Sequence, residues 1–316
     1  MSVLELRDLT VDYASRAGRI RAVDQVGFSI AKGTTVGLVG ESGCGKSTLG
    51  KAILRILPET AKVTGEIRFD GKDLLHLPDR EVRKYRGRQV SLIFQDPMTR
   101  LNPLMTIGDH FVEAVQAHDP ETSADEALSR ARKVLADVRI PGTRLTQYPH
   151  ELSGGMRQRI MIALALVFNP TLLIADEPTT SLDVIVEAQI LELLEEIKSR
   201  YDVGVLLITH NLALVAEYAE ECAVMYAGKL AEFSSVDTLF ADPLHPYTKG
   251  LLESTIHLES TRLQSIPGQP PDLLHPPSGC PFHPRCPSVM PECREVMPPR
   301  TEPKPGRQVA CYLYPS

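Results

Sequence analysis

Three glycines, three hydroxyl side chains and a lysine are concentrated in residues 40–48, which read Gly-Glu-Ser-Gly-Cys-Gly-Lys-Ser-Thr. Glycines allow backbone N–H groups to curve around the phosphates of a nucleotide, Lys46 adds a positive charge, and the hydroxyl of Ser47 suits Mg²⁺. The run 36–39 predicts a buried strand and residues 48–56 predict a helix, so the phosphates would lie at a helix N-terminus. The predicted phosphate-binding residues are Gly40, Ser42, Gly43, Cys44, Gly45, Lys46, Ser47 and Thr48.

Two adjacent carboxylates, Asp176 and Glu177, follow the apolar run 172–175, which predicts a buried parallel strand. At the end of that strand Asp176 is placed to hold Mg²⁺ directly or through water, and Glu177 to orient or deprotonate an attacking water. Alternatively, both carboxylates only cap the helix that follows Pro178. The phosphate-binding loop upstream favours the catalytic interpretation.

Residues 153–155, Ser-Gly-Gly, open a further predicted helix and offer a hydroxyl and unobstructed N–H groups to another phosphate. An ordinary helix N-cap would account for Ser153 but not for both Gly154 and Gly155. His210 follows a second apolar run, 203–209, which also predicts a buried strand. A single histidine at a strand end is usually structural, so the residues alone leave its role open.

The order of these motifs resembles that of ATP-binding-cassette (ABC) proteins over roughly the first three-quarters of the chain. Residues 152–156 are similar to the signature of that family, LSGGQ, with Met156 in place of Gln. The resemblance implies that Tyr13 stacks on adenine, that Gln95 senses Mg²⁺ and the attacking water, and that His210 contacts the γ-phosphate. The implied catalytic residues are Glu177, His210 and Gln95, and the implied Mg²⁺ ligands are Ser47, Gln95 and Asp176.

Pairing of two cassettes is a further implication of the resemblance. Each ATP would be held between the Lys46 loop of one chain and the Ser153 signature of the other. Residues 181–183 resemble the loop that crosses this dimer interface: Ser181 stands where the family usually has Ala, and Asp183 is kept. ATP would therefore be hydrolysed by a pair of chains.

Two stretches resemble one subfamily. Residues 94–103, FQDPMTRLNP, are similar to FQDPMTSLNP of ATPases that serve dipeptide, oligopeptide and nickel importers, with Arg100 in place of Ser. Residues 243–248 match the His-Pro-Tyr motif that the same subfamily carries after the cassette. The implied partners are a related ATPase subunit, in a heterodimer or a homodimer, two transmembrane permease subunits and an extracytoplasmic substrate-binding protein. The chain would then lie peripherally at the cytoplasmic face of the cell membrane, and its substrate stays open among dipeptides, oligopeptides, nickel and peptide-like compounds.

The charge balance and the apolar runs of the sequence argue against two classes of function, nucleic-acid binding and membrane spanning. The 316 residues carry 34 Lys plus Arg and 40 Asp plus Glu, a net charge of −6, so no basic surplus favours nucleic-acid binding. The longest apolar run, 160–168, has nine residues, whereas a membrane-spanning helix needs ~20. Residues 1–13 lack the apolar core of a secretory signal. We therefore expect membrane association through a protein partner.

Proline divides the chain, since sixteen of the 25 prolines fall within residues 241–316, where helices are hard to sustain. We predict an ABC nucleotide-binding domain over residues 1–242 and an extension over residues 243–316, called the tail below. The predicted fold is α/β: a mostly parallel P-loop core sheet, an antiparallel β subdomain near the N-terminus, and a helical subdomain at about residues 96–165.

Four of the six cysteines lie in the tail, at Cys280, Cys286, Cys293 and Cys311. An intracellular chain keeps thiols reduced, which makes two disulfides the weaker alternative to four thiolates holding zinc or an iron–sulfur cluster. The spacing lacks the Cys-x-x-Cys knuckles of many zinc sites, and His283 is a candidate replacement ligand. The subfamily resemblance implies a [4Fe–4S] cluster, whose binding would supply much of the folding energy of the tail.

Two rival functions are weaker. A soluble ABC ATPase of translation or DNA repair typically has two cassettes or long coiled coils, and neither pattern occurs in this sequence. A purely regulatory nucleotide-binding module conflicts with the intact Glu177.

Overall fold

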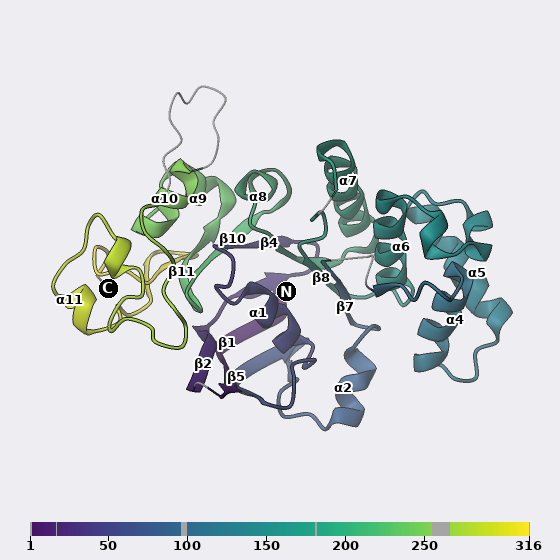
Figure 1. The fold of residues 1–316 in the computed structure, drawn as a ribbon, viewed down its shortest axis with the longest axis horizontal. Helices are drawn as coiled ribbons and strands as arrows, with labels where there is room; N and C mark the ends of the chain where they lie inside the picture. Colours follow the sequence, from purple (N-terminus) through teal and green to yellow (C-terminus); the bar gives the residue numbers. More distant parts are fainter. Residues whose placement is uncertain (1, 17, 96–99, 181, 255–265, 316) are drawn as a thin grey trace. The chain divides into compact units, whose positions relative to one another are not determined.

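The computed structural model describes residues 2–16, 18–95, 100–180, 182–254 and 266–315 (Figure 1). The chain forms two compact units. The first unit comprises residues 1–77 and 206–316, and the second comprises residues 78–205. The predicted boundary between residues 242 and 243 lies within the first unit and stays a prediction.

An antiparallel sheet forms the N-terminal part of the first unit. Its strands are β1 (Ser2–Ser15), β2 (Gly18–Val26), β3 (Ser29–Ala31), β5 (Ala61–Phe69) and β6 (Lys72–Asp73). Their order is β2-β1-β5-β6, and β3 also pairs with β1. Leu4 and Leu6 of β1 are buried on one face of the strand, and Leu9 is buried where the pairing register shifts between Arg7 and Thr10. The predicted antiparallel subdomain is confirmed.

A second sheet of the first unit carries the phosphate-binding loop. Its strands are β4 (Thr35–Val39), β10 (Glu221–Tyr226), β11 (Lys229–Ser235), β12 (Thr301–Lys304) and β13 (Arg307–Val309). β10 runs parallel to β4 and antiparallel to β11, and β13 joins the far side of β11. Every residue of β4 is buried. Two tail strands therefore extend the sheet in which the loop is anchored.

Helices complete the first unit. They are α1 (Lys46–Ile53), α8 (Leu212–Tyr218), α9 (Val236–Ala241), α10 (Pro246–Glu253) and α11 (Glu292–Glu295). α1 begins two residues before the predicted position 48 and ends before 56, because Arg55 adopts a positive φ of 52° that ends the helical backbone. A Cβ on Gly37 of β4 would lie 2.5 Å from Cγ1 of Val215, so α8 packs closely over this strand.

The tail shares a hydrophobic core with β10. Tyr226 of β10, Tyr247 of α10 and Phe282 form an aromatic cluster with ring centroids 4.5 to 5.4 Å apart. Cys280 and Cys293 belong to the same buried cluster. The proline-rich tail is therefore packed onto the sheet through its aromatic residues.

The second unit contains two parallel strands and most of the remaining helices. Its elements are β7 (Val90–Ile93), β8 (Leu172–Asp176), α2 (Asp79–Tyr85), α4 (Ile107–His118), α5 (Ala124–Asp137), α6 (Gly154–Leu166) and α7 (Val184–Tyr201). α4, α5 and α6 lie together in Figure 1, as the predicted helical subdomain requires. α4 begins with a reciprocal capping box between Thr106 and Asp109. β9 (Gly204–Ile208) is divided between the two units.

In the part of the chain that the structure describes, none of the helices combines the length and apolar character that crossing a membrane requires.

Candidate nucleotide site

Glycine geometry shapes the phosphate-binding loop between β4 and α1. Gly40, Gly43 and Gly45 have φ angles of 150°, 80° and 106°, which side-chain-bearing residues rarely adopt. At Gly45 a Cβ would lie 2.1 Å from the carbonyl oxygen of Ala22. Gly45 is also the N-cap of α1 and brings no side chain to it. The N-terminus of α1 thus lacks a side-chain cap from Gly45, and its predicted role in binding phosphate stays a prediction.

Lys46 is turned into this loop. Its side chain is buried, with a residue exposure of 6%, and Nζ donates to the carbonyl oxygens of Gly40 at 2.7 Å and Glu41 at 3.1 Å. Burial raises the pKa of the neighbouring Cys44 thiol. The carbonyl groups of the loop thus hold Nζ of Lys46 in place.

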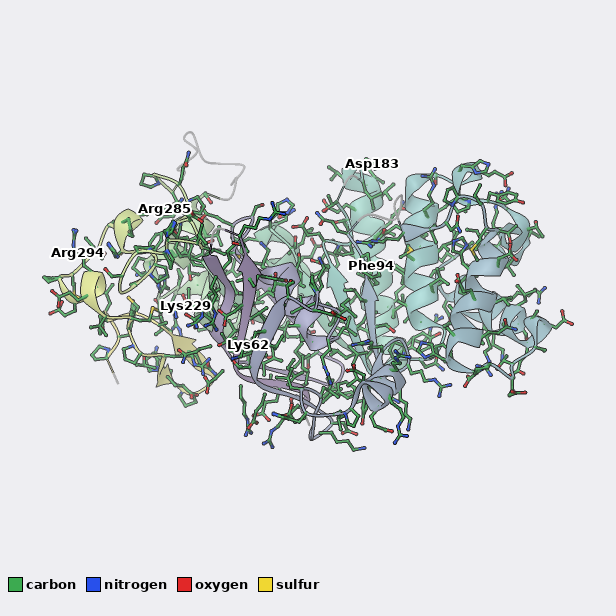
Figure 2. The ribbon with its side chains drawn as sticks, turned by 60° about the horizontal axis from the view of Figure 1, so that its bottom comes forward. Lys62, Phe94, Asp183, Lys229, Arg285 and Arg294 are labelled. Carbon is green, nitrogen blue, oxygen red and sulfur yellow. The ribbon has the colours of Figure 1, made fainter. Side chains whose placement is uncertain are left out.

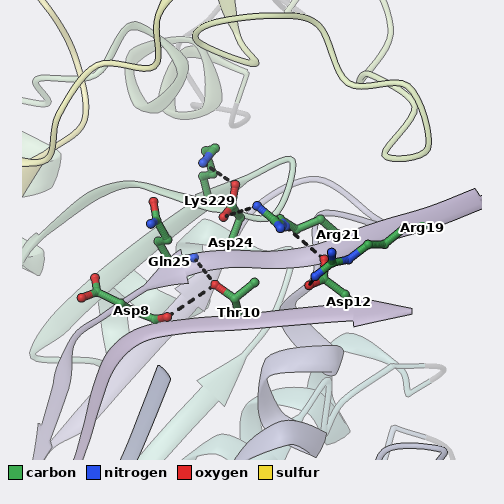
Figure 3. Close-up of polar contacts among 8 residues, drawn as sticks. All are labelled: Asp8, Thr10, Asp12, Arg19, Arg21, Asp24, Gln25 and Lys229. Carbon is green, nitrogen blue, oxygen red and sulfur yellow. Dashed lines mark hydrogen bonds and ion pairs between the residues drawn. The ribbon is translucent and has the colours of Figure 1, made fainter. Parts of the chain in front are cut away.

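Tyr13, the predicted adenine-stacking residue, lies beside the start of α1. Its hydroxyl is 3.5 Å from Oγ1 of Thr48. The strand that carries it, β1, is tied to β2 by the polar network of Figure 3. In that network Asp12 pairs with Arg19 and Arg21. Burial opposes ionisation of Asp12, but the two guanidinium groups hold its pKa below the usual range.

The same network continues to β11. Arg21 also pairs with Asp24, and Asp24 pairs with Lys229. Figure 3 shows these side chains side by side on one face of β2. The network therefore connects the strands around Tyr13 to the sheet that carries the phosphate-binding loop.

In the second unit, Asp176 and Glu177 stand at the end of β8. Asp176 is buried, and Glu177 has a positive φ of 47°. One carboxylate oxygen of Glu177, Oε2, accepts hydrogen bonds from Nε2 of Gln95 at 2.8 Å and from the hydroxyl of Thr180 at 2.9 Å. The structure thus brings two predicted catalytic residues into direct contact and adds Thr180, which sequence reasoning missed.

Strand pairing explains this contact. β7 and β8 run parallel, with Ile93 opposite Ala175. Gln95 and Glu177 each follow two residues later, so both side chains leave the same edge of the sheet. Neither motif predicts the pairing by itself.

The Ser-Gly-Gly sequence opens α6. The hydroxyl of Ser153 accepts from the N–H of Met156 at 3.3 Å, so Ser153 is a conventional N-cap. A Cβ on Gly155 would lie 2.7 Å from Cγ1 of Val186 on α7, whereas one on Gly154 would meet Leu182 at an ordinary 3.6 Å. Helix packing therefore supplies a reason for Gly155 that spacing did not reveal.

Asp183, labelled in Figure 2, is the N-cap of α7 and accepts from the N–H of Val186 at 2.9 Å. Ser181, at the start of the predicted interface loop, and residues 96–99 lie outside the described residues. The next two side chains, Val184 and Ile185, are 80% and 72% exposed. An apolar surface thus follows the loop that was predicted to cross a dimer interface.

His210 lies in the first unit and is exposed after β9. The N–H of Thr209 donates to the carbonyl oxygen of Leu38 at 3.1 Å, which aligns the end of β9 with the end of β4. His210 therefore follows the strand that flanks the phosphate-binding loop. Its predicted contact with the γ-phosphate stays a prediction.

Comparison with known proteins agrees with this geometry. Residues 23–180 match the family model described as ABC transporter. The chain is 51% identical over 294 residues to the dipeptide transport ATP-binding protein DppD of Bacillus subtilis, covering 91% of this chain and 88% of that one. It belongs to the ABC transporter family.

Other comparisons place the chain within the ABC family. Residues 231–293 match the model of the oligopeptide/dipeptide transporter C-terminal region. The oligopeptide transport ATP-binding protein OppD of Escherichia coli is 44% identical, with 98% of this chain and 93% of that one covered. A solved dimeric structure of the ATP-binding cassette MJ0796 with ADP and Pi has a TM-score of 0.65 and 28% identity over 74% of this chain and 98% of that one. The predicted ABC cassette fold is confirmed.

The His-Pro-Tyr motif of this ABC ATPase begins helix α10 and contacts the phosphate-binding loop. His245 is the N-cap of α10, and its Nδ1 accepts from the N–H of Tyr247 at 3.0 Å. Burial lowers the pKa of His245 to about 4, so its ring is neutral at neutral pH, and the hydrogen bond from Tyr247 places the remaining ring proton on Nε2. Pro246 occupies the first helical position, where its missing N–H costs nothing. The hydroxyl of Tyr247 then accepts from the N–H of Glu41 in the phosphate-binding loop at 3.0 Å.

A buried carboxylate anchors this motif. Glu232 of β11 is fully buried and accepts from the N–H groups of Leu244 and His245, both at 2.9 Å. Arg307 of β13 lies 3.7 Å from the same carboxylate and also pairs with Asp242. Burial raises the pKa of Glu232, against the effect of these bonds and of Arg307. The motif is therefore held by strands on both sides of residue 242.

The four tail cysteines line one small enclosed cavity, together with residues that include Phe282 and His245. None of them is in a disulfide. Among the residues that the structure describes, no three His, Cys, Asp or Glu side chains stand close enough to share one metal ion. His283, the predicted replacement ligand, has its Nδ1 3.0 Å from the carbonyl oxygen of Cys280. The cysteines converge, but they do not form a single-ion site.

Proposed function

We propose that this chain is the ATP-hydrolysing subunit of a peptide importer. The observation that carries the proposal is the phosphate-binding loop joined to the His-Pro-Tyr motif by the Tyr247–Glu41 hydrogen bond. This bond links a general ATPase element to the region that matches oligopeptide/dipeptide transporters. The names of the DppD and OppD relatives, which cover most of the chain, support dipeptides or oligopeptides as cargo. A nickel importer of the same family is the alternative.

The site residues support a direct attack of water on ATP. Lys46 and the glycine N–H groups would hold the phosphates, and Tyr13 the adenine. Glu177 would take a proton from the attacking water as the water oxygen bonds to the γ-phosphorus. The bond between the γ-phosphorus and the β–γ bridging oxygen then breaks, which releases ADP and phosphate. Gln95 and Thr180 fix the carboxylate for this step.

Magnesium suits the donors that the sequence assigns to it. The hydroxyl of Ser47, the amide oxygen of Gln95 and the carboxylate of Asp176 are all hard oxygen ligands. When bound, the ion would neutralise charge on the phosphates. In the structure the amide nitrogen of Gln95 donates a hydrogen bond to Glu177, so the amide oxygen would be the metal-binding atom of Gln95.

We extend the proposal to an assembly. Two cassettes would pair, with Ser153, Gly154, Gly155 and Asp183 of each chain facing the ATP of the other, and the exposed Val184 and Ile185 support a contact there. The second cassette would be a related ATPase, and the pair would sit at the cytoplasmic face of the membrane with two permease subunits and an extracytoplasmic binding protein. Activity that is strictly first-order in the isolated chain, and unchanged by the partners, would argue against this arrangement.

An iron–sulfur cluster is the proposed ligand of the tail cysteines. A zinc ion needs four sulfurs at about 2.3 Å from one point. A [4Fe–4S] cluster distributes its cysteines over several irons, so its thiolates stand farther apart. What supports a shared ligand here is that four free cysteines line one cavity.

Anaerobic purification tests this ligand. The wild type and the control Cys222→Ala, which alters a cysteine outside the tail, should contain iron and sulfide, and Cys286→Ser should lose both. Stoichiometric zinc without iron would overturn the cluster. Ready alkylation of all four native thiols, with neither metal present, would overturn any metal site.

The transport proposal is tested by reconstitution with its permeases and binding protein in liposomes. We expect ATP-dependent uptake of a labelled dipeptide or oligopeptide, abolished by Glu177→Gln and unaffected by the exposed tail variant Arg294→Ala. Uptake of Ni²⁺ in place of peptides would select the alternative, and peptide uptake that does not require ATP would refute the proposal.

A further inference from the structure

A tail arginine reaches the phosphate-binding loop. Arg285, which precedes Cys286, is labelled in Figure 2, and its side chain is only 6% exposed. Nη1 donates to Oε2 of Glu41 at 2.7 Å, and Nη2 donates to Oε1 at 3.0 Å. This bidentate pair joins residues 244 positions apart, and Glu41 is the second residue of the loop.

The remaining guanidinium N–H groups also have acceptors. Nε donates to the carbonyl oxygen of Pro267 at 2.9 Å, and Nη2 to that of Ile266 at 3.2 Å. Nη1 also donates to the hydroxyl of Tyr226 at 3.2 Å. Five interactions therefore hold a permanent charge in one orientation.

Glu41 in turn is held at three points. Its carboxylate binds Arg285, its N–H donates to the hydroxyl of Tyr247, and its carbonyl oxygen accepts from Nζ of Lys46 at 3.1 Å. The carbonyl oxygen that helps to orient Lys46 thus belongs to a residue whose other two polar groups are fixed by residues of the tail.

The charge of Arg285 has a second consequence. Without it, the Glu41 carboxylate would stand uncompensated in a loop that must receive the negative phosphates of ATP. Repulsion between like charges in a partly buried site is weakly screened by solvent. Loss of Arg285 should therefore weaken nucleotide binding by loosening the loop and by exposing this repulsion.

We propose that Arg285 is a positioning residue for nucleotide binding: it clamps Glu41 and thereby couples the docked tail to the affinity of the phosphate-binding loop for ATP. The inference rests on the ATP-binding role proposed above. It makes the tail a determinant of nucleotide affinity.

The test measures the Kd of a fluorescent ATP analogue with Mg²⁺ for the full chain. Arg285→Met should raise Kd about tenfold, the usual scale of one charge-assisted pair, and Arg285→Lys should raise it less. The double variant Arg285→Met/Glu41→Gln should bind more tightly than Arg285→Met alone, because the repulsive carboxylate is gone. A purely structural role for Arg285 would not produce this rescue.

Arg300→Met is the matched control. Arg300 also joins the tail to the rest of the first unit, through the carbonyl oxygen of Gly27 at 3.2 Å and Asp8 at 3.5 Å, but it does not contact Glu41. Its Kd should stay within about twofold of wild type if only the clamp matters. Hydrogen exchange of residues 40–48 should rise in Arg285→Met and stay unchanged in Arg300→Met.

Three outcomes would overturn the proposal: an unchanged Kd in Arg285→Met, an equal loss in Arg300→Met, or no rescue by Glu41→Gln. A wild-type chain that fails to bind the nucleotide, as Lys46→Ala should fail, would refute the proposed function instead. The two failures are therefore distinguishable.

Discussion

Replacing Gly155 by alanine would force a new Cβ to within 2.7 Å of Cγ1 of Val186, where carbon atoms in contact need more than 3.4 Å. Valine is stiff about χ1, so it cannot swing aside without cost. Overpacking of this kind destabilises by about 1–3 kcal/mol, and the alanine regains at most ~1 kcal/mol through its lower backbone entropy. We expect Gly155→Ala to lower the free energy of unfolding by about 1–2 kcal/mol.

The second variant, Gly155→Ala/Val186→Ala, removes the clashing methyl and should recover most of this loss, so the two substitutions are non-additive by about 1 kcal/mol. Urea unfolding followed by far-UV circular dichroism is the suitable assay, since the chain has no tryptophan. Gly154→Ala is the control, because its Cβ would meet Leu182 at an ordinary 3.6 Å, so this variant should not lower the free energy of unfolding.

The same variants separate packing from chemistry. If the backbone of Gly155 faces the ATP of a partner chain, the double variant regains stability but its ATPase rate in the assembled transporter stays low. A stable Gly155→Ala protein, or a double variant no more stable than it, would refute the packing argument. Full recovery of ATPase would refute the phosphate-contacting role.

Three further outcomes are expected. Glu177→Gln should lower kcat about 10²–10³-fold and leave the Kd of ATP within about threefold, because the carboxylate acts on water; rapid turnover by this variant would exclude Glu177 as the base. Burial and the neighbouring Glu220 raise the pKa of Glu221, so the stability linked to its proton is present below the ordinary carboxyl pKa and lost as pH rises. Glu221→Gln should therefore stabilise the chain at pH 7 and progressively less towards pH 4, by urea midpoints; a gain independent of pH would contradict this. Cys286→Ser should make the tail more susceptible to proteolysis, and an unchanged digestion pattern would show that the tail needs no ligand.

Local chemistry made part of the site predictable. The phosphate-binding loop can be predicted from the sequence because two of its positions, Gly40 and Gly45, have φ angles and close backbone contacts that admit only glycine. Lys46 follows within the same few residues. The strand that ends at Asp176 was readable from its uninterrupted apolar run, which a buried parallel strand requires. Here the interactions that determine the structure lie within a few residues of each other. The end of α1 was not readable, since it depends on the backbone of Arg55.

Tertiary structure decided the contacts between these segments. Gln95 meets Glu177 because β7 and β8 pair in parallel, and no property of either motif selects that partner. The need for glycine at 155 comes from Val186 on another helix. Arg285 reaches Glu41 across 244 residues because the tail docks on β10 through Tyr247 and Phe282. The sequence by itself determined which chemical groups are present and their local backbone geometry, whereas long-range packing determined which of them touch, because the free energy of those contacts exists only once the strands and helices have assembled.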